Sequence, residues 1–356
     1  MVLRRVVFAP LIVVITVVVL AFSPLILIGA AFVVRWLPGR WRGLRFLWFL
    51  LVYLVRESVG LVAMFVLWVL SGFGWSLGSD RMQRAHVFLV GWYLNGLVVS
   101  ARRVLGVRVV TEELPTGLTV DNPFRRGSGA GGKPVLVFSR HAGAGDSFLL
   151  VGLLVRTYGR RPRIVLKDQL QFDPCVDVVL NRLPNRFISP NPAPGAGVVD
   201  SIAELAAGLK PDGALILFPE GGNFSESRRQ KAIQRLVDDN LDDLVPLAEE
   251  LTHVLPPRPG GAIAAIDASP DADVMFVAHT GLERLASLRD LWNELPMRTE
   301  VRMAWWTVPA EHVPTDHHER ITWLYAWWEH IDTWIEDRRL ADTPKGPKLE
   351  SGVEAP

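Results

Sequence analysis

The stretch KPVLVFSRHAGAGD, residues 133–146, decides how this chain folds. It opens with the apolar run Val135–Phe138, which is too short for a helix and carries β-branched valines, and it therefore predicts a buried β-strand. His141 and a glycine-rich turn follow the strand, and residues 147–154 predict a helix with Asp146 or the following serine at its N-cap. The sequence thus places an imidazole at a strand end and a carboxylate at the start of the next helix.

The glycines between His141 and Asp146 let the backbone turn tightly, so that the two side chains can meet. A carboxylate that binds one ring nitrogen fixes the tautomer and makes the other nitrogen more basic. The pair would then act as a general base that takes a proton from a hydroxyl near neutral pH. A histidine that only caps the turn is the structural alternative. Because this spacing also arises easily by chance, the prediction depends on a second motif.

Further short apolar runs predict β-strands at residues 107–111, 162–166, 187–189, 214–218 and 273–279. Helical patterns lie between them, for example at residues 201–209. This alternation predicts an α/β fold, a mostly parallel mixed sheet flanked by helices. Sites in such sheets lie at the carboxyl ends of the strands, and His141 and Glu220 both follow such ends.

The composition excludes some kinds of site. Hydrophobic residues make up 49% of the 356 residues, a high share for a purely soluble protein. The single cysteine, Cys175, excludes an intrachain disulfide and a cysteine-based metal site, and it fits a reducing compartment. Asp316-His317-His318-Glu319 could suggest a metal, but without other clustered ligands it predicts a solvated helix N-terminus. We therefore expect neither a metal nor a cofactor.

Two apolar stretches open the chain, at residues 6–34 and at about 46–74. The first is long enough to cross a bilayer and too long for the apolar core of a secretory signal. Arg56-Glu57 interrupts the second, which favours a helix lying partly in the interface because charges inside a span are costly. Two ordinary spans are the alternative, but they would put the arginine-rich loop 35–42 opposite the catalytic region, against the positive-inside tendency. We expect a two-helix element embedded in one leaflet.

Charge is distributed unevenly, although the net charge is only +1. Residues 1–110 hold twelve arginines and two acids, so the rest of the chain is acidic. Basic residues in the most apolar part of a chain favour contact with anionic lipids rather than with nucleic acid. The expected location is the cell membrane, with the catalytic domain facing the cytoplasm and with membrane lipids, not nucleic acid, as partners.

The second motif is Phe218-Pro219-Glu220-Gly221, whose glutamate lies 79 residues after His141. Together with His141–Asp146 it resembles the glycerolipid acyltransferase family, which includes the 1-acyl-sn-glycerol-3-phosphate acyltransferases, over about residues 84–279. The resemblance implies the fold of that family and a membrane-bound O-acyltransferase of phospholipid biosynthesis. Such an enzyme moves an acyl chain from a thioester, acyl-CoA or acyl-carrier protein, to a lysophospholipid hydroxyl, first of all that of 1-acyl-sn-glycerol-3-phosphate. The carrier protein would then be a partner.

The resemblance also implies roles for individual residues. His141 would be the general base and Asp146 its orienting carboxylate. Glu220 and Gly221 would belong to the acceptor-binding motif, and Lys167, at a predicted strand end, would contact the phosphate of the acceptor. The structural alternatives are a solvated turn acid for Glu220 and a plain surface lysine for Lys167. Because a thioester is already activated, the acceptor hydroxyl would attack it directly, without an enzyme nucleophile.

The sequence departs from the family at two places. The family commonly continues with Thr-Arg-Ser after Glu-Gly, where this chain has Gly222-Asn223-Phe224, and it has an arginine where this chain has Ser189. Other arginines are therefore candidates for binding a phosphate: Arg182, Arg186, Arg228, Arg229 and the proline-flanked Arg258. Of these we predict Arg228 and Arg258 as substrate-binding residues, beside Lys167, Glu220, Gly221 and Gly222. Backbone N–H groups of residues 143–145 or of Gly221-Gly222 are the candidate oxyanion donors.

These observations divide the chain into four predicted regions. Membrane-embedded helices occupy residues 1–78, and the α/β acyltransferase domain occupies residues 79–312, with a polar loop at 223–231 and an acidic helix at 232–250. A tryptophan-rich helix at residues 313–340 has its tryptophans at helical spacing and is expected to dock onto the domain. Residues 341–356 predict a disordered tail.

Three alternative functions stay open. The acceptor is a different lysophospholipid or a glycolipid in the first. A lipid hydrolase is the second, but it needs a nucleophile, and we expect no Gly-x-Ser-x-Gly elbow in this chain. A non-catalytic membrane protein that keeps the fold is the third. Loss of acyl transfer in a His141→Ala variant separates the enzyme from this last alternative.

Overall fold

The computed structural model describes residues 2–36, 41–112, 132–143, 145–188, 197–283, 292 and 300–342. Three long helices open the chain: α1 (Val2–Val34), α2 (Arg42–Leu70) and α3 (Asp80–Ser100). The strands are β1 (Arg108–Glu112), β2 (Val135–Ser139), β3 (Arg161–Lys167), β4 (Arg186–Ile188), β5 (Gly213–Leu217), β6 (Asp273–Thr280) and β7 (Glu300–Val308). The later helices are α4 (Asp146–Arg156), α5 (Pro174–Leu180), α6 (Val198–Ala207), α7 (Glu226–Asp238), α8 (Val245–Glu250), α9 (Pro259–Ala268) and α11 (His317–Asp342).

The strands of the described residues form one sheet in the order β1-β7-β6-β2-β5-β3-β4. Strands β6, β2, β5, β3 and β4 run parallel, whereas β7 joins β6 antiparallel and β1 runs parallel to β7. This confirms the predicted mixed, mostly parallel sheet flanked by helices. Because β2 and β5 are parallel neighbours, with Phe138 opposite Leu217, the residues that follow them meet at one edge of the sheet.

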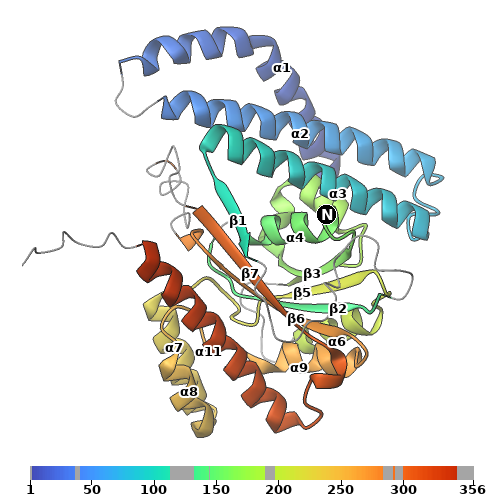
Figure 1. Ribbon diagram of the computed structural model, residues 1–356. Helices are drawn as coiled ribbons and strands as arrows, with labels where there is room; N and C mark the ends of the chain where they lie inside the picture. The colour runs from blue at the N-terminus through green and yellow to red at the C-terminus, as the bar shows by residue number, and fades with distance from the viewer. Residues whose placement is uncertain are drawn as a thin grey trace, which may run out of the picture.

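Helices cover both faces of this sheet, which explains why β2 and β5 are buried along their whole length. Val135 and Val137 pack into the cluster that includes α3 and α4, and Leu136 and Phe138 pack into the cluster formed with α6, α9 and α11. Figure 1 shows α1, α2 and α3 on one side of the sheet and α6, α9 and α11 on the other. The tryptophan-rich α11 docks as expected, with Trp327 stacked on Phe276 at 4.5 Å between ring centroids.

The segment after β5 differs from the prediction. The expected polar loop at residues 223–231 ends early, because Ser225 caps α7 by accepting a hydrogen bond from the N–H of Arg228. The expected helix at 232–250 is interrupted where Asn240 adopts a left-handed conformation with φ of 55°, and α8 follows separately. Arg228 and Arg235 therefore lie two turns apart on one helix, on the same side of it.

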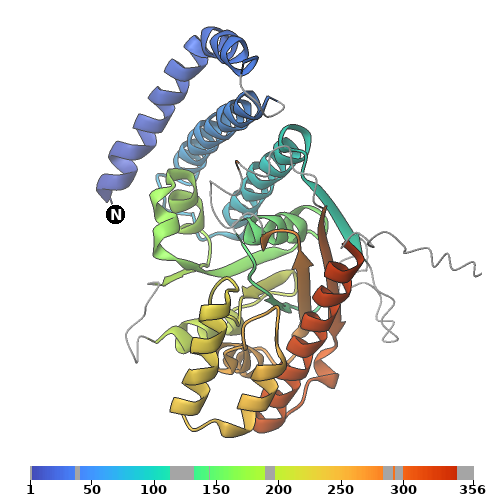
Figure 2. The same ribbon diagram turned by 90° about the vertical axis from the view of Figure 1, so that its left-hand side faces the viewer.

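Helices α1 and α2 are both long and apolar enough to cross a membrane. Helix α1 bends and contains Pro10 and Pro24, which explains the bend (Figures 1 and 2). The charged pair inside α2 faces protein: Arg56 donates to the carbonyl of Trp92 at 2.9 Å, and Glu57 accepts from the N–H of Cys175 at 2.7 Å. The two charged side chains that make this helix a costly membrane span are thus hydrogen-bonded to backbone groups of the protein.

The predicted disordered tail lies outside the described residues from position 343 onward, and residues 341 and 342 end α11. The position that departs from the second family motif, residue 189, also lies outside the described residues, as do positions 37–40 of the arginine-rich loop.

Candidate active site

His141 and Asp146 meet at the carboxyl end of β2. Nδ1 of His141 lies 2.6 Å from Oδ2 of Asp146, so the ring donates its Nδ1–H to the carboxylate and keeps a lone pair on Nε2. The Asp146 side chain is 2% exposed and the His141 side chain 19% exposed. The imidazole packs against the ring of Phe218, with 4.8 Å between centroids. Within the described part of the chain Nε2 has no hydrogen-bond partner, so the site presents an oriented base that a substrate can reach.

The turn between these two residues folds back onto the carboxylate. Asp146 Oδ2 also accepts from the N–H of Ala142 at 3.1 Å. Gly143 has to lack a side chain, because a Cβ there would lie 2.4 Å from the carbonyl oxygen of Leu282. Burial is the largest single effect and opposes the ionisation of Asp146, but the hydrogen bonds and charges around the carboxylate, led by the hydrogen bond from His141, together outweigh burial and lower the pKa of the carboxyl. Asp146 is therefore an anion at neutral pH that fixes the imidazole ring.

Glu220, which follows the neighbouring strand β5, holds the backbone of His141 in place. Its side chain is buried; Oε1 accepts from the N–H of His141 at 2.9 Å, and Oε2 accepts from the N–H of Leu255 at 3.0 Å. Burial raises the pKa of Glu220 to about 7, although both N–H groups favour its ionised form. Glu220 thus ties together the segments after β2 and β5 and the loop before α9. It acts on the base through the backbone, whereas the sequence predicted a contact with the acceptor.

A buried arginine and a second histidine lie behind the base, and sequence reasoning missed both. Arg140 Nη1 donates to the carbonyl of His279 at 2.6 Å and to Glu283 at 2.5 Å, and its Nη2 donates to the carbonyl of His253 at 3.1 Å. His279 Nε2 returns a hydrogen bond to the Arg140 carbonyl at 3.1 Å. Burial, and then the charge of Arg140, lower the pKa of His279 to about 4, so this ring is neutral. Arg140 stands directly before His141 in the sequence, but no local sequence pattern indicates that its side chain is buried.

Comparison with known proteins fits this geometry. Residues 107–280 match the family model described as Acyltransferase, and the match includes β2, the histidine–aspartate pair and the Glu220 corner. The chain carries an acyltransferase-family domain. The predicted family is thereby confirmed, and it supports acyltransferase activity in general. No curated protein matches the chain.

The acyltransferase domain brings some of the predicted substrate-binding residues together. Gly221 adopts a left-handed conformation with φ of 68°, and a Cβ there would lie 3.1 Å from Cζ of Arg258. A Cβ on Gly222 would lie 3.4 Å from Nη1 of Arg228. Lys167 is exposed at the end of β3, at the same edge of the sheet as the base but beyond β5. Both arginines thus lie against the Gly221-Gly222 turn, whereas Lys167 stands apart on the next strand.

The other candidate arginines of the domain bind protein groups. Arg182 Nη1 donates to the carbonyl of Met64 at 2.7 Å, and Arg186 pairs with Glu204 at 2.8 Å. Arg229 donates to the carbonyls of Leu251 and Glu249. These three arginines are therefore structural, and only Arg228 and Arg258 of the predicted set are placed to contact a substrate at the Gly221-Gly222 turn.

Asp332 on α11 binds the backbone of the loop that leads to Leu255, one of the hydrogen-bond partners of Glu220. Its carboxylate accepts from the N–H groups of Thr252 at 3.1 Å, His253 at 2.6 Å and Val254 at 3.0 Å. The same loop continues to Leu255, the partner of Glu220. Asp332 was missed because its 80-residue separation from Thr252 leaves no local signal.

Two other patterns carry no site in the acyltransferase. Gly74-Trp75-Ser76-Leu77-Gly78 matches the Gly-x-Ser-x-Gly pattern of hydrolases, but it forms the turn between α2 and α3, and Ser76 Oγ donates to the carbonyl of Ser71 at 2.9 Å. A nucleophile elbow would need a strand before the serine. The Asp316 carboxylate accepts from the N–H groups of His318 and Glu319, as the expected helix N-terminus does. Across the described residues no group of three or more histidine, cysteine or acidic side chains is placed to hold a metal ion.

Proposed function

We propose that this protein is a membrane-bound O-acyltransferase that moves an acyl chain from an acyl thioester to the hydroxyl of a lysophospholipid, in phospholipid biosynthesis. The observation that carries the proposal is the 2.6 Å contact between His141 Nδ1 and Asp146, which leaves Nε2 as an accessible base. The default acceptor is 1-acyl-sn-glycerol-3-phosphate, as in the family that the sequence resembles. The donor is acyl-CoA or an acylated carrier protein.

The reaction needs one proton transfer in each direction. Nε2 of His141 takes the proton of the acceptor hydroxyl while its oxygen attacks the thioester carbonyl carbon. Asp146 stabilises the imidazolium that forms. When the C–S bond breaks, the thiolate leaves and takes the proton back from His141. The products are the acylated lipid and the free thiol, and the protein forms no covalent bond.

The negative oxygen of the intermediate needs N–H donors. The N–H of Gly221 is occupied, because it donates to the carbonyl of Phe218 at 3.0 Å. The N–H of Gly222 has no acceptor within the described part of the chain, and neither does that of Gly145. These two groups therefore support the proposed oxyanion contact better than Gly221 does.

The N-terminal helices support a membrane location and, we propose, a hairpin held in one leaflet. Helix α2 is tied to the domain on one side through Tyr53, whose hydroxyl donates to Asp173 at 2.6 Å. Helix α1 is tied to the same region by Arg5, which pairs with the buried Asp177 at 2.7 Å. Large apolar side chains of α1 and α2 remain exposed on the other side. A hairpin fixed to the domain in this way favours insertion from the cytoplasmic face without crossing the bilayer.

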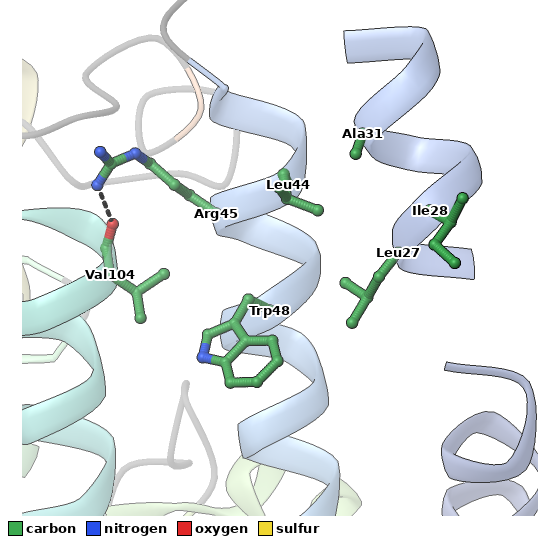
Figure 3. Close-up of a pocket in the computed structure, with 7 residues that line it drawn as sticks. All are labelled: Leu27, Ile28, Ala31, Leu44, Arg45, Trp48 and Val104. Carbon is green, nitrogen blue, oxygen red and sulfur yellow. Dashed lines mark hydrogen bonds between the residues drawn. The ribbon is translucent and has the colours of Figure 1, made fainter. Parts of the chain in front are cut away.

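An apolar recess of about 430 Å³ lies between the two helices (Figure 3). Leu27, Ala31, Leu44 and Trp48 contribute to its lining, and Arg45 lies beside it with its guanidinium donating to the carbonyl of Val104 at 2.8 Å. Such an apolar surface is more stable in contact with hydrocarbon than with water. The recess supports contact of this hairpin with lipid chains.

Membranes containing the protein, incubated with labelled acyl-CoA or acylated carrier protein and a panel of lysolipids, test the function. The wild type and a His317→Ala control, changed at an exposed histidine, should give acylated product, and His141→Ala should give none. Product from His141→Ala, or none from the wild type with any lysolipid, would contradict the proposal. Loss of activity in Ser139→Ala or Ser147→Ala, with retention in His141→Ala, would favour a hydrolase-type mechanism instead.

A further inference from the structure

One peptide bond carries the proposed base away from the end of β2, and the fold holds both of its polar groups. Its N–H belongs to His141 and donates to Oε1 of Glu220 at 2.9 Å. Its carbonyl belongs to Arg140 and accepts from Nε2 of His279 at 3.1 Å, and also from the Ser139 hydroxyl at 3.0 Å. Because a peptide unit is planar, holding its two ends fixes the direction in which the chain enters the base. Side chains from β6 and from the segment after β5, the two strands that flank β2, therefore hold one plane.

His279 is itself fixed by the residue whose carbonyl it binds. Its backbone carbonyl accepts from Nη1 of Arg140 at 2.6 Å. The same guanidinium pairs with Glu283 at 2.5 Å and donates to the carbonyl of His253 at 3.1 Å. The side chains of Arg140 and His279 are both buried, at 1% and 2% exposed. Two reciprocal hydrogen bonds thus join these residues, and the packing around them leaves the imidazole little freedom to leave the carbonyl.

The second imidazole lies close to the carboxylate that orients the base, yet it does not compete for that carboxylate. A carbonyl oxygen only accepts, so Nε2 of His279 carries the hydrogen that it shares with Arg140. The same Nε2 lies 4.0 Å from Oδ2 of Asp146, the partner of His141. A positively charged His279 would attract this carboxylate as well. Burial, and then the charge of Arg140, hold the pKa of His279 well below its usual range, so the ring is neutral at pH 7 and Asp146 serves the base alone.

We propose that His279 is a positioning residue of the acyl-transfer site: its Nε2–H holds the carbonyl side of the peptide that carries His141. Glu220 holds the N–H side of the same peptide, and the two contacts together aim the His141 ring at Asp146. The inference rests on the proposed acyl transfer and adds a residue to its site. His279 is buried behind the base and does not touch the substrate. Loss of its hydrogen bond should therefore lower kcat and leave KM nearly unchanged, because the base is misaligned while the binding surface stays intact.

The kinetic test compares His279→Gln with His279→Leu. The glutamine amide places an N–H donor near the position of Nε2, whereas leucine fills the space without a donor. Membranes containing each variant are assayed with labelled acyl-CoA and the lysolipid that serves the wild type. We expect His279→Leu to lower kcat about tenfold with KM changed less than about twofold, and His279→Gln to keep kcat within about threefold of the wild type. Met275→Leu, a buried change on β6, and His312→Leu, at an exposed histidine, are the controls and should behave as the wild type.

Wild-type kcat in His279→Leu, equal losses in the two variants, or a change in KM alone would overturn the inference. A second readout is independent of turnover: amide hydrogen exchange of the purified protein, followed by mass spectrometry. Peptides that cover residues 139–146 should exchange about tenfold faster in His279→Leu than in the wild type and in His279→Gln, while peptides from α3 stay unchanged.

Unchanged exchange at residues 139–146 would reject the positioning role. Faster exchange along the whole chain in both variants would also reject it, because His279 would then support the fold and not the peptide of the base. If the wild type shows no acyl transfer with any lysolipid, the proposed function fails. The exchange experiment still decides by itself whether His279 holds this peptide.

Discussion

The carboxylate of Glu220 accepts a hydrogen bond from the backbone N–H of His141 at 2.9 Å, although the two residues are 79 positions apart. The second carboxylate oxygen binds Leu255 in a third segment. Glu220 is thereby a positioning residue: it fixes the peptide that carries the base and the loop that carries Arg258. An acid at this corner follows from packing, because a buried carboxylate is the simplest acceptor for two N–H groups that approach from different sides.

Glu220→Gln should reduce activity and stability together. The amide keeps one acceptor oxygen, but its NH2 group faces a backbone N–H, and leaving one buried donor unsatisfied costs about 1–3 kcal/mol. We expect a lower free energy of unfolding in denaturant titrations and a fall in kcat. Glu226→Gln, at an exposed position of α7, is the matched control and should behave as the wild type. A Glu220→Gln protein with wild-type kcat would show that catalysis does not need the hydrogen bonds of Glu220 to the backbone of His141 and Leu255.

The same variant makes a prediction about pH. Burial raises the pKa of Glu220 from 4.5 to about 7, so between these values the folded state binds a proton that the unfolded state has released. The contribution of Glu220 to the free energy of unfolding therefore falls as pH rises from about 4.5 to 7, by up to about 3 kcal/mol. The difference in unfolding free energy between wild type and Glu220→Gln, measured across this range, should shrink with increasing pH. A difference that grows would contradict the assignment.

Asp146→Asn should lower kcat by about 100-fold or more, because the amide no longer stabilises the imidazolium that forms when His141 takes a proton. KM should change little, since Asp146 is buried and contacts His141 rather than the substrate. Steady-state kinetics on membranes test this, with Asp200→Asn at an exposed position as the control. Retention of more than half of the wild-type kcat would remove Asp146 from the mechanism.

Asp332→Asn should weaken the site from a distance. The carboxylate accepts from three consecutive backbone N–H groups and from the Thr252 hydroxyl, at 3.0 Å, and an amide has one oxygen to replace them. We expect a loss of about 2–3 kcal/mol in the free energy of unfolding and a raised KM, because the loop leading to Arg258 loosens. Glu329→Gln, exposed on the same helix, is the control. If unfolding changes but KM does not, the loop is structural and does not position a substrate-binding residue.

The proposed hairpin topology predicts which positions share a side of the membrane. Cys175 is the only cysteine and is buried, so a Cys175→Ser background allows single cysteines at Trp41 and at Asp239. A hairpin in one leaflet places position 41, between α1 and α2, on the same side as Asp239 in the catalytic domain. A membrane-impermeant maleimide should then label both positions in inside-out vesicles and neither in right-side-out cells. Labelling of position 41 from the opposite side would show that α2 crosses the bilayer.

The local patterns of the chain were sufficient for much of the fold. The Val135–Phe138 run predicted β2 because both faces of that strand are covered, which makes its apolar character continuous. The α7 segment was predicted wrongly because its arginines and serines look like a polar loop, and an exposed helix without a buried residue gives no apolar period to detect.

The sequence by itself predicted the pairing of His141 with Asp146, since two of the four residues between them are glycines that let the backbone turn tightly. It also predicted the two apolar N-terminal stretches, because composition alone shows where hydrophobic side chains are concentrated. Only the tertiary structure decided that Arg258 lies against Gly221 and that Glu220 accepts a hydrogen bond from the backbone of His141. It also decided that Asp332 binds the backbone of the loop that begins at Thr252. These contacts join residues 35 to 80 positions apart, and their energy depends on where packing of the sheet and helices places each backbone N–H, which no local pattern records.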